Sequence, residues 1–348
     1  MLLELYDLSL PVHTLHLLFA LAIGAVFGAC AQISRFCLRR AVAGEGGPDS
    51  SAASVWISAL AVSVGAFAAA RFTGFVEVSD HRLMSANIPV LAIVTGGVLF
   101  GAGMVLTRGC VSRLTVLSGT GNLRAVVVLA VFALVAHATL KGVLAPLRTA
   151  LGSVSVDLPV GTLASAPGVA PALSIGLMGL ALYLARSSGT RPLHILLGGV
   201  IGMVSVAGWM TTSVLLFDEF DPLPAQSAAF TLPWSDTLFW FIASSAIPAG
   251  FGAGFIGGVV LGSFSSAALR GELALQSFTA PSETLRYISG GALMGLGGVL
   301  AGGCTVGAGL SGGAMLSVSA LLALGSIIAG AALTRQFPAF RRGARALA

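Results

Sequence analysis

The chain alternates long apolar segments with short polar ones. Nine of the apolar segments are long enough to cross a bilayer as a helix, which takes about 20 apolar residues. The predicted spans are residues 14–34, 52–71, 87–106, 122–141, 171–186, 193–216, 239–261, 284–302 and 316–335. The fifth span is short, and the seventh contains Pro248, a residue type that interrupts helices. The pattern predicts an all-α polytopic membrane protein with about nine transmembrane helices in a single integral membrane domain over residues 1–348.

The composition strengthens this interpretation. Of the 348 residues, 56% are hydrophobic and 9% are charged, whereas an ordinary soluble domain has about 25% charged residues. These values exclude a soluble globular enzyme, a disordered protein, a coiled coil and a disulfide-stapled secreted domain. The 46 glycines are typical of membrane helices that pack closely through small residues.

The positive charges are distributed unevenly over the segments between the spans. With the N-terminus outside, 14 of the 18 Lys and Arg residues fall on the cytoplasmic side, and the outer four are Arg71, Arg82, Lys141 and Arg148. Cytoplasmic loops carry the excess of Lys and Arg, so we expect a periplasmic N-terminus and a cytoplasmic C-terminus in a bacterial inner membrane. The net charge of +5 then reflects orientation rather than binding to nucleic acid.

The two ends of the chain carry opposite charge. Glu4 and Asp7 precede the first span where a cleavable signal peptide would have a basic segment, so we expect a transmembrane helix there. Arg341, Arg342 and Arg345 form a basic tail that we expect to anchor the C-terminus against anionic membrane lipid. Docking of a cytosolic partner is the alternative role for the tail.

Two segments of the chain repeat one another. Residues 96–110 (GGVLFGAGMVLTRGC) align with residues 290–304 (GGALMGLGGVLAGGC) at an offset of 194, and nine of the fifteen positions are identical. In the predicted topology the first copy runs inward and the second runs outward. Antiparallel copies predict an inverted internal repeat, with halves at about 1–150 and 190–340, of the kind that places a transporter's substrate near the membrane midplane.

Each copy ends in Gly-Cys and is followed by a segment too short to span the membrane, over residues 111–121 and 305–313. Non-helical backbone at membrane depth is tolerated where it lines a cavity or is buried in protein, so both segments predict re-entrant half-helices. A half-helix that begins near Gly109 and Cys110, or near Gly303 and Cys304, directs free N–H groups and partial positive charge at the centre, which favours an anion. The alternative is a pair of glycine-rich turns between packed helices. Asn122 is placed to cap the helix that follows the first segment.

The chain has four cysteines and no C-x-x-C motif. Cys30 is interpreted as a small apolar packing residue, while the repeat favours a functional role for Cys110 and Cys304. Cys30 and Cys37 share a face if their helix is continuous, but Cys37 follows the end of the apolar run and fits a third short half-helix. The cysteines and the five histidines form no metal-binding pattern, and no metal or cofactor is expected.

Three motifs carry a resemblance to a known family. They are Gln32-x-Ser-Arg-Phe-Cys37, then Arg108-Gly-Cys110-x-x-Arg113 followed by Gly121-Asn-Leu-Arg-Ala125, and then residues 300–312 (LAGGCTVGAGLSG). In these motifs the chain resembles the YeeE/YedE family of bacterial membrane proteins, whose characterised members take up thiosulfate.

The resemblance implies an hourglass-shaped helical fold and three functional thiols, which match Cys37, Cys110 and Cys304 here. It also implies that thiosulfate passes between thiols through weak hydrogen bonds, and that a small cytosolic sulfurtransferase of the TusA-like type is a frequent partner. Arg35, Gln32, Arg113 and Thr305 lie in the same motifs and are further candidates for binding the substrate. Ala308 and Gly309 depart from the family pattern, because several members have a polar or basic residue there.

Three other functions remain open at this point. A membrane thiol oxidoreductase would use Cys110 and Cys304 as a redox pair, although the C-x-x-C motif is missing. A membrane anchor subunit without transport would leave the repeat unexplained. A transporter of another small sulfur- or selenium-containing anion would use the same path. The first of these is an enzyme; the interpretation preferred here is a transporter and not an enzyme.

Overall fold

The computed structural model describes residues 11–44, 46–78, 81–166, 168–217 and 223–336. The acidic N-terminal residues and the basic tail discussed above lie outside this range, so their predicted roles stay predictions.

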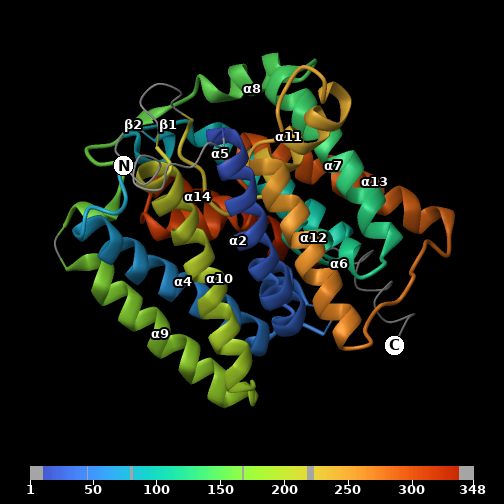
Figure 1. Ribbon diagram of the computed structural model, residues 1–348, viewed down its shortest axis with the longest axis horizontal. Coiled ribbons are helices and arrows are strands. Elements are labelled where there is room, and N and C mark those ends of the chain that lie inside the picture. The colour runs from blue at the N-terminus through green and yellow to red at the C-terminus, as the bar shows by residue number, and fades with distance from the viewer. Residues whose placement is uncertain (1–10, 45, 79–80, 167, 218–222, 337–348) are drawn as a thin grey trace.

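Most of the described chain is helical (Figure 1). Its α-helices are α2 (Val12–Ser34), α3 (Leu38–Ala43), α4 (Ser50–Phe72), α5 (Val90–Leu106), α6 (Val111–Gly119), α7 (Leu123–Lys141), α8 (Ala145–Gly152), α9 (Val169–Ser188), α10 (Pro192–Met210), α11 (Thr231–Ala243), α12 (Phe251–Leu269), α13 (Pro281–Leu300) and α14 (Val318–Gln336). Shorter turns are the 3₁₀ segments η1 (Arg82–Met84) and η2 (Leu163–Ser165) and the π-helical segments η3 (Thr211–Leu215) and η4 (Gly307–Gly312). Two short antiparallel strands, β1 (Asn87–Ile88) and β2 (Val156–Asp157), pair with each other. The predicted all-α class is confirmed.

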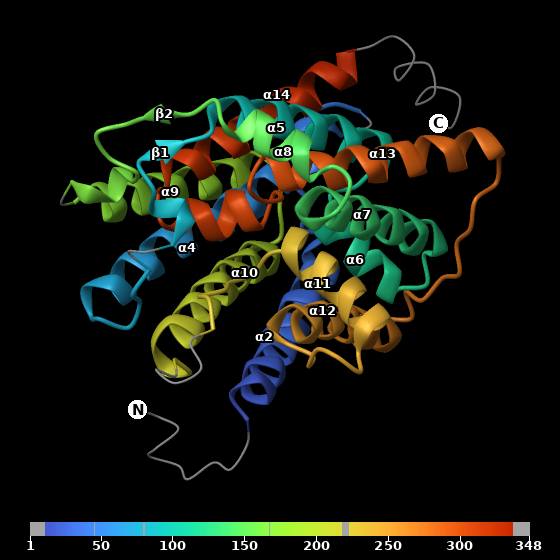
Figure 2. The same ribbon diagram turned by 90° about the horizontal axis from the view of Figure 1, so that it is seen from above.

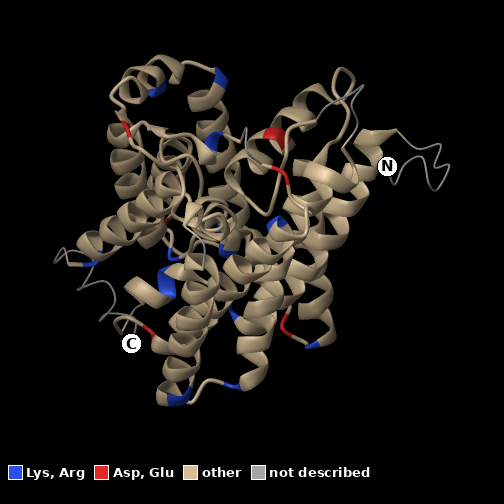
Figure 3. Cartoon of the chain, turned by 90° about the vertical axis from the view of Figure 1, so that its left-hand side faces the viewer, with Lys and Arg blue, Asp and Glu red and all other residues tan. Residues whose placement is uncertain are grey.

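The long helices have the length and apolar character of membrane spans. Within the described residues, eight helical segments are long and apolar enough to cross a bilayer, which makes the chain a multi-pass membrane protein. Figure 3 shows that the long helices carry uncharged residues over most of their length. The predicted span over 284–302 corresponds to α13, a helix of 20 residues with Glu283 and Arg286 in its first turns, and the number nine stays a prediction.

One predicted span is wrong. The seventh was expected over residues 239–261, but α11 ends at Ala243 and α12 begins at Phe251. The intervening residues 244–250 include Pro248, which lacks an N–H group and clashes with the preceding turn of a helix. Gly250 is extended and is the N-cap of α12. Apart from Ser244 and Ser245 the break consists of apolar residues, so hydropathy joined two helices that the backbone separates.

Helices of the two repeat copies meet at glycines. A Cβ atom on Gly96 of α5 would lie 2.8 Å from the carbonyl oxygen of Gly297 on α13, and one on Gly103 would lie 2.6 Å from that of Gly290. Gly96 and Gly290 occupy the same position in the two copies, and so do Gly103 and Gly297, because each pair of numbers differs by the repeat offset of 194. The Gly96–Gly297 contact is therefore the counterpart of the Gly103–Gly290 contact. The two contacts thus join equivalent positions of the two sequence copies.

The neighbouring helices continue the same pattern. A Cβ on Gly101 would meet the carbonyl oxygen of Ile327 on α14 at 2.3 Å, and one on Gly295 would meet that of Phe132 on α7 at 2.7 Å. Helices α7 and α14 have 19 residues each and begin at Leu123 and Val318. Helix α7 therefore packs against α13 in the same way as α14 packs against α5.

A second group of helices packs in the same way. Helix α2 lies between α10 and α12, and α10 also contacts α4 (Figures 1 and 2). In each close pair a glycine faces a carbonyl oxygen of the neighbouring helix at less than 3 Å from its would-be Cβ: Gly24 with Phe255, Gly28 with Val259, Gly198 with Val55, and Gly202 with Ala59. The α2–α12 contact thus has a counterpart in the α10–α4 contact.

These contacts predict different effects for two adjacent glycines of α12. A Cβ on Gly258 would lie 2.2 Å from the carbonyl oxygen of Leu21, whereas no atom lies within 4 Å of one on Gly257. Gly258→Ala forces α2 and α12 apart and is expected to destabilise the fold by about 1–3 kcal/mol or more. Gly257→Ala is the matched control and should leave stability unchanged. Thermal unfolding of the two variants in detergent checks this, and equal midpoints would contradict the packing described here.

Candidate functional site

Three of the four cysteines occupy the same local structure. In each case a long helix stops, a residue with positive φ follows, and the cysteine comes two residues later, directly before a short helix or turn. The positive-φ residues are Arg35 (φ 52°), Arg108 (φ 56°) and Gly302 (φ 77°), and the cysteines are Cys37, Cys110 and Cys304. A left-handed residue is a common way to end a helix, since it turns the chain back toward the last free carbonyls.

The first turn follows α2. Arg35 lies in the left-handed region, and the N–H of Phe36 donates to the carbonyl of Ala31 at 3.2 Å. Cys37 is then the N-cap of α3. The interruption shows that Cys30 and Cys37 do not share one continuous helix. A short helix, α3, follows Cys37, and its role as a half-helix stays a prediction.

The second turn follows α5. The N–H of Gly109 donates to the carbonyl of Met104 at 3.1 Å, and the Thr107 hydroxyl donates to the Gly103 and Gly109 carbonyls, both at 2.9 Å. Cys110 is the N-cap of the short helix α6, which begins where the sequence predicted one; the re-entrant placement of this helix stays a prediction. The Asn122 side chain accepts from the N–H of Ala125 and caps α7, which confirms that prediction as well.

The third turn follows α13. After Gly302 and Gly303 the chain reaches Cys304, whose carbonyl accepts from the N–H of Ala308 at 2.9 Å. The N–H of Gly307 donates to the Cys304 sulfur at 3.4 Å. The π-helical segment η4 therefore begins a few residues later than expected, and the cysteine sulfur satisfies one of its free amides. Thr305 is buried beside Cys304.

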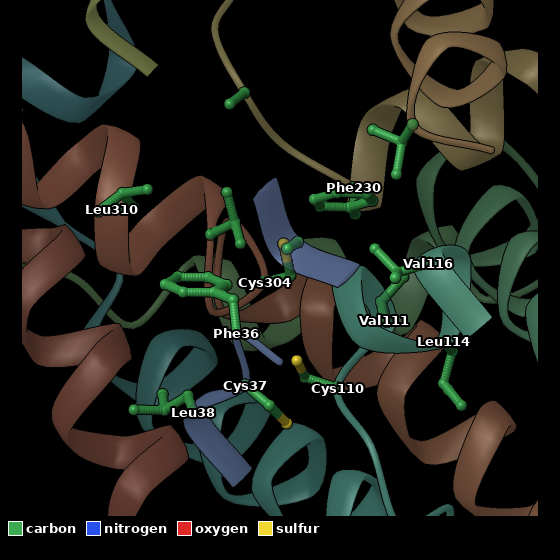
Figure 4. Close-up of a cluster of buried hydrophobic side chains, with 14 of the residues drawn as sticks. Phe36, Cys37, Leu38, Cys110, Val111, Leu114, Val116, Phe230, Cys304 and Leu310 are labelled. Carbon is green, nitrogen blue, oxygen red and sulfur yellow. The ribbon is translucent and has the colours of Figure 1, made fainter. Parts of the chain in front are cut away.

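The three thiols form a row inside the protein. Cys37, Cys110 and Cys304 are at most 2% exposed, and all are free thiols. The Cys37 and Cys110 side chains are neighbours (Figure 4), and the Cys110 sulfur lies 3.2 Å from the Ser112 hydroxyl. Figure 4 shows Cys304, Cys110 and Cys37 in succession, with Phe230 beyond Cys304 and Phe36 beside the row. Cys30 is also buried, but it belongs to the body of α2.

Two of the candidate polar residues meet at the Cys37 end of the row. The Arg113 guanidinium donates to the side-chain oxygen of Gln32 at 3.3 Å, and the Gln32 amide donates to Glu272 at 3.0 Å. Arg270 and Gln32 hold the pKa of Glu272 below its ordinary value. Among the described residues no carboxylate forms an ion pair with Arg113, so this cation keeps its charge available beside Cys37 and Cys110.

The remaining candidates are in the turns themselves. Gly109 and Gly303 precede their cysteines, as expected, but neither has positive φ, and the left-handed position is one residue earlier in each turn. The Arg35 side chain is exposed, and its carbonyl accepts from the Arg40 guanidinium at 3.4 Å. A residue that sequence reasoning missed is Arg82, which donates to the Gly302 carbonyl at 2.7 Å. Arg82 and Gly302 are 220 residues apart in the chain, and no sequence motif predicts their contact.

Other features of the described structure do not compete with the thiol row. An apolar groove of about 640 Å³ between α9 and α10 is lined by residues such as Met178, Leu182 and Ile195 and includes no cysteine. Its lining is that of a lipid-facing surface. The described residues contain no group of three or more His, Cys, Asp or Glu side chains suited to a metal ion.

Comparison with known proteins identifies the family. A family model described as sulphur transport matches residues 33–333, which takes in all three turns. The chain belongs to the sulphur transport family. It is also 29% identical, over 254 residues, to the thiosulfate transporter TsuA of Spirochaeta thermophila, a match that covers 67% of this chain and 74% of that protein.

The family assignment confirms the resemblance to YeeE/YedE proteins drawn from the three motifs. It supports a role in the transport of a sulfur-containing anion, and it makes the protein a transporter rather than an enzyme. The match begins just before Arg35 and ends in α14, so it includes every candidate residue except Gln32.

The arrangement of the thiols predicts which of them oxidation joins. Treatment of the purified protein with a thiol oxidant is expected to link Cys37 to Cys110, because their side chains are neighbours, and to leave Cys30 and Cys304 free. Mass spectrometry of non-reduced peptides checks this, with Cys37→Ser as the control that removes the link. A Cys110–Cys304 disulfide in its place would contradict the geometry and would revive the redox-pair interpretation.

Proposed function

We propose that this protein takes up thiosulfate across the bacterial inner membrane along a central path lined by Cys37, Cys110 and Cys304. The single observation that carries the proposal is the row of three buried free thiols, each placed at a turn that opens a short helix. The thiosulfate transporter among the relatives supports the choice of anion.

The chemistry of the row suits a divalent anion that must keep moving. A thiol donates a weak hydrogen bond, so several thiols in series provide shallow binding sites. Conduction requires binding that is weak enough for release. The backbone N–H groups at the start of the short helices add positive potential, and they bind an anion less tightly than a pair of arginines would. Arg113 adds a full positive charge at the Cys37 end.

We propose that the membrane domain is built as an inverted repeat. The paired glycine contacts of α5 with α13, and of α2 with α12, support this arrangement because each has a counterpart in the other half. The axis then relates the turns at Cys110 and Cys304 and places them on either side of the membrane centre, in re-entrant segments. The distribution of Lys and Arg supports a periplasmic N-terminus and a cytoplasmic C-terminus, so that the path runs from Cys304 inward to Cys37. An hourglass shape narrowed at the row follows from the family resemblance.

The proposed route ends at the cytoplasmic face, where a TusA-like sulfurtransferase is the expected recipient of the sulfur. Consumption of thiosulfate by such a partner would keep its internal concentration low and would sustain inward flow.

Uptake of labelled thiosulfate tests the proposal. In a bacterium that lacks its own thiosulfate importers, the intact chain should support uptake. Cys110→Ala or Cys304→Ala should reduce uptake to background, because one thiol of the row is lost. Cys30→Ala is the matched control, since Cys30 is a buried thiol (8% exposed) in the body of α2 and outside the turns, and it should leave uptake intact. Normal uptake in both row variants, with confirmed membrane expression, would contradict a thiol-lined path.

Competition by sulfate tests the role of the thiols in selectivity. Sulfate presents oxygen atoms alone, whereas thiosulfate has a polarizable terminal sulfur that suits contact with S–H groups. Unlabelled sulfate in excess is therefore expected to inhibit uptake far less than the same excess of unlabelled thiosulfate. Equal inhibition by the two anions would show that charge and size decide binding and that the thiols do not discriminate.

A further inference from the structure

The three cysteine turns differ in one respect. The left-handed residue is an arginine in two of them, Arg35 before Cys37 and Arg108 before Cys110, and a glycine in the third, Gly302 before Cys304. The turns before Cys37 and Cys110 thus each include an arginine where the long helix ends, and the turn before Cys304 includes no cationic residue.

An arginine from another element reaches the third turn. Arg82 begins η1, and its Nη2 atom donates to the Gly302 carbonyl at 2.7 Å. Its Nη1 atom lies 3.8 Å from the position that a Cβ on Gly302 would take. The guanidinium therefore lies against the residue that corresponds to Arg108 in the repeat, since 108 and 302 differ by the offset of 194.

Each turn needs such a charge for an electrostatic reason. The C-terminal end of a long helix carries partial negative charge on its free carbonyls, and α13 ends at Leu300, close to Cys304. An anion approaching Cys304 would be repelled by this helix end unless a cation compensates it. Arg82 is placed to do so, and it keeps further N–H donors beyond the one committed to Gly302.

The surroundings leave the charge of Arg82 available to a ligand. Within the described residues, no carboxylate forms an ion pair with it, and its side chain keeps an exposed surface. Although part of the side chain is exposed, nearby protein atoms partly desolvate the guanidinium and lower the pKa of Arg82, which still remains protonated at neutral pH. Its neighbour His81 packs edge-on against Trp209 at 4.9 Å, and burial lowers the pKa of His81 to about 4. His81 is therefore neutral, and Arg82 supplies the positive charge.

We infer that Arg82 is an anion-binding residue at the Cys304 end of the path, where it captures a divalent sulfur oxyanion before the anion reaches the thiol. The inference rests on the proposed function, because it assumes that an anion travels along the row. In the proposed orientation this end faces the periplasm, so Arg82 acts at the entrance while Arg113 acts at the exit.

A purely structural role makes a different prediction. If Arg82 serves only to cap α13, its loss lowers stability and the amount of folded protein, but the remaining molecules bind substrate with normal affinity. If Arg82 binds the anion, its loss raises the KM for uptake in molecules that are folded. The two roles are separated by measuring KM and thermal stability on the same variants.

The experiment compares Arg82→Gln, Arg82→Lys and Arg71→Gln. Arg71 is an exposed arginine at the end of α4 on the same side in the proposed topology, and it controls for a general change in surface charge. For Arg82→Gln we expect KM for labelled thiosulfate to rise about tenfold, the effect of losing a hydrogen bond to a charged group, with a far smaller change in maximal rate. Arg82→Lys should recover most of the affinity, and Arg71→Gln should match the unsubstituted protein.

An unchanged KM in Arg82→Gln, whether or not the unfolding midpoint falls, would overturn the inference. A failure of the proposed function is recognised separately, because the unsubstituted chain would then take up no thiosulfate. In that case the purified proteins are heated with thiosulfate, sulfate or selenite. Stabilisation by one of these anions that is lost in Arg82→Gln and kept in Arg71→Gln supports the anion-binding role, and stabilisation that is equal in both variants, or absent for every anion, contradicts it.

Discussion

The structure depends on how hydrogen bonds are completed at the ends of helices that stop inside the protein. Where a helix ends away from water, its last carbonyls and the first amides of the next helix need partners. At Cys37, Cys110 and Cys304 a left-handed residue turns the chain back, and a short helix or turn opens at once. At Cys304 one amide of that new segment, the N–H of Gly307, donates to the cysteine sulfur. Ending a helix inside the protein thus places a buried thiol beside the first amides of a new helix or turn.

Close packing makes these interruptions stable. Glycines of α2, α5, α12 and α13 allow carbonyls of the adjacent helix to approach to distances that any side chain would prevent. Dispersion contacts and the small-residue interfaces hold the long helices together in lipid, so the short segments need contribute little to stability. The reciprocal glycine contacts of α5 and α13 hold in place the two helices that end at the Cys110 and Cys304 turns.

Electrostatics explains why arginines accompany the cysteines. Helix C-termini point partial negative charge at the turns, and an anion there requires compensation. Arg35 and Arg108 are part of the turns, and Arg82 contacts the third from a distant segment. In the proposed function, positive charge thus comes from several residues instead of one tight cluster, which suits an anion that must be released as well as bound.

The sequence by itself determined the fold class, most of the spans, the repeated Gly-Cys segments and the family, because hydropathy, composition and motif spacing are properties of consecutive residues. It joined α11 to α12, since apolar side chains continue through the break at Pro248, and it left open whether Cys37 shared a helix with Cys30, since hydropathy does not report backbone φ. The tertiary structure alone decided that Cys37 lies beside Cys110, that Gln32 links Arg113 to Glu272, and that Arg82 reaches Gly302 from 220 residues away. The physical reason is that such contacts depend on how helices dock across the molecule, and docking is set by glycine interfaces between segments that no local pattern connects.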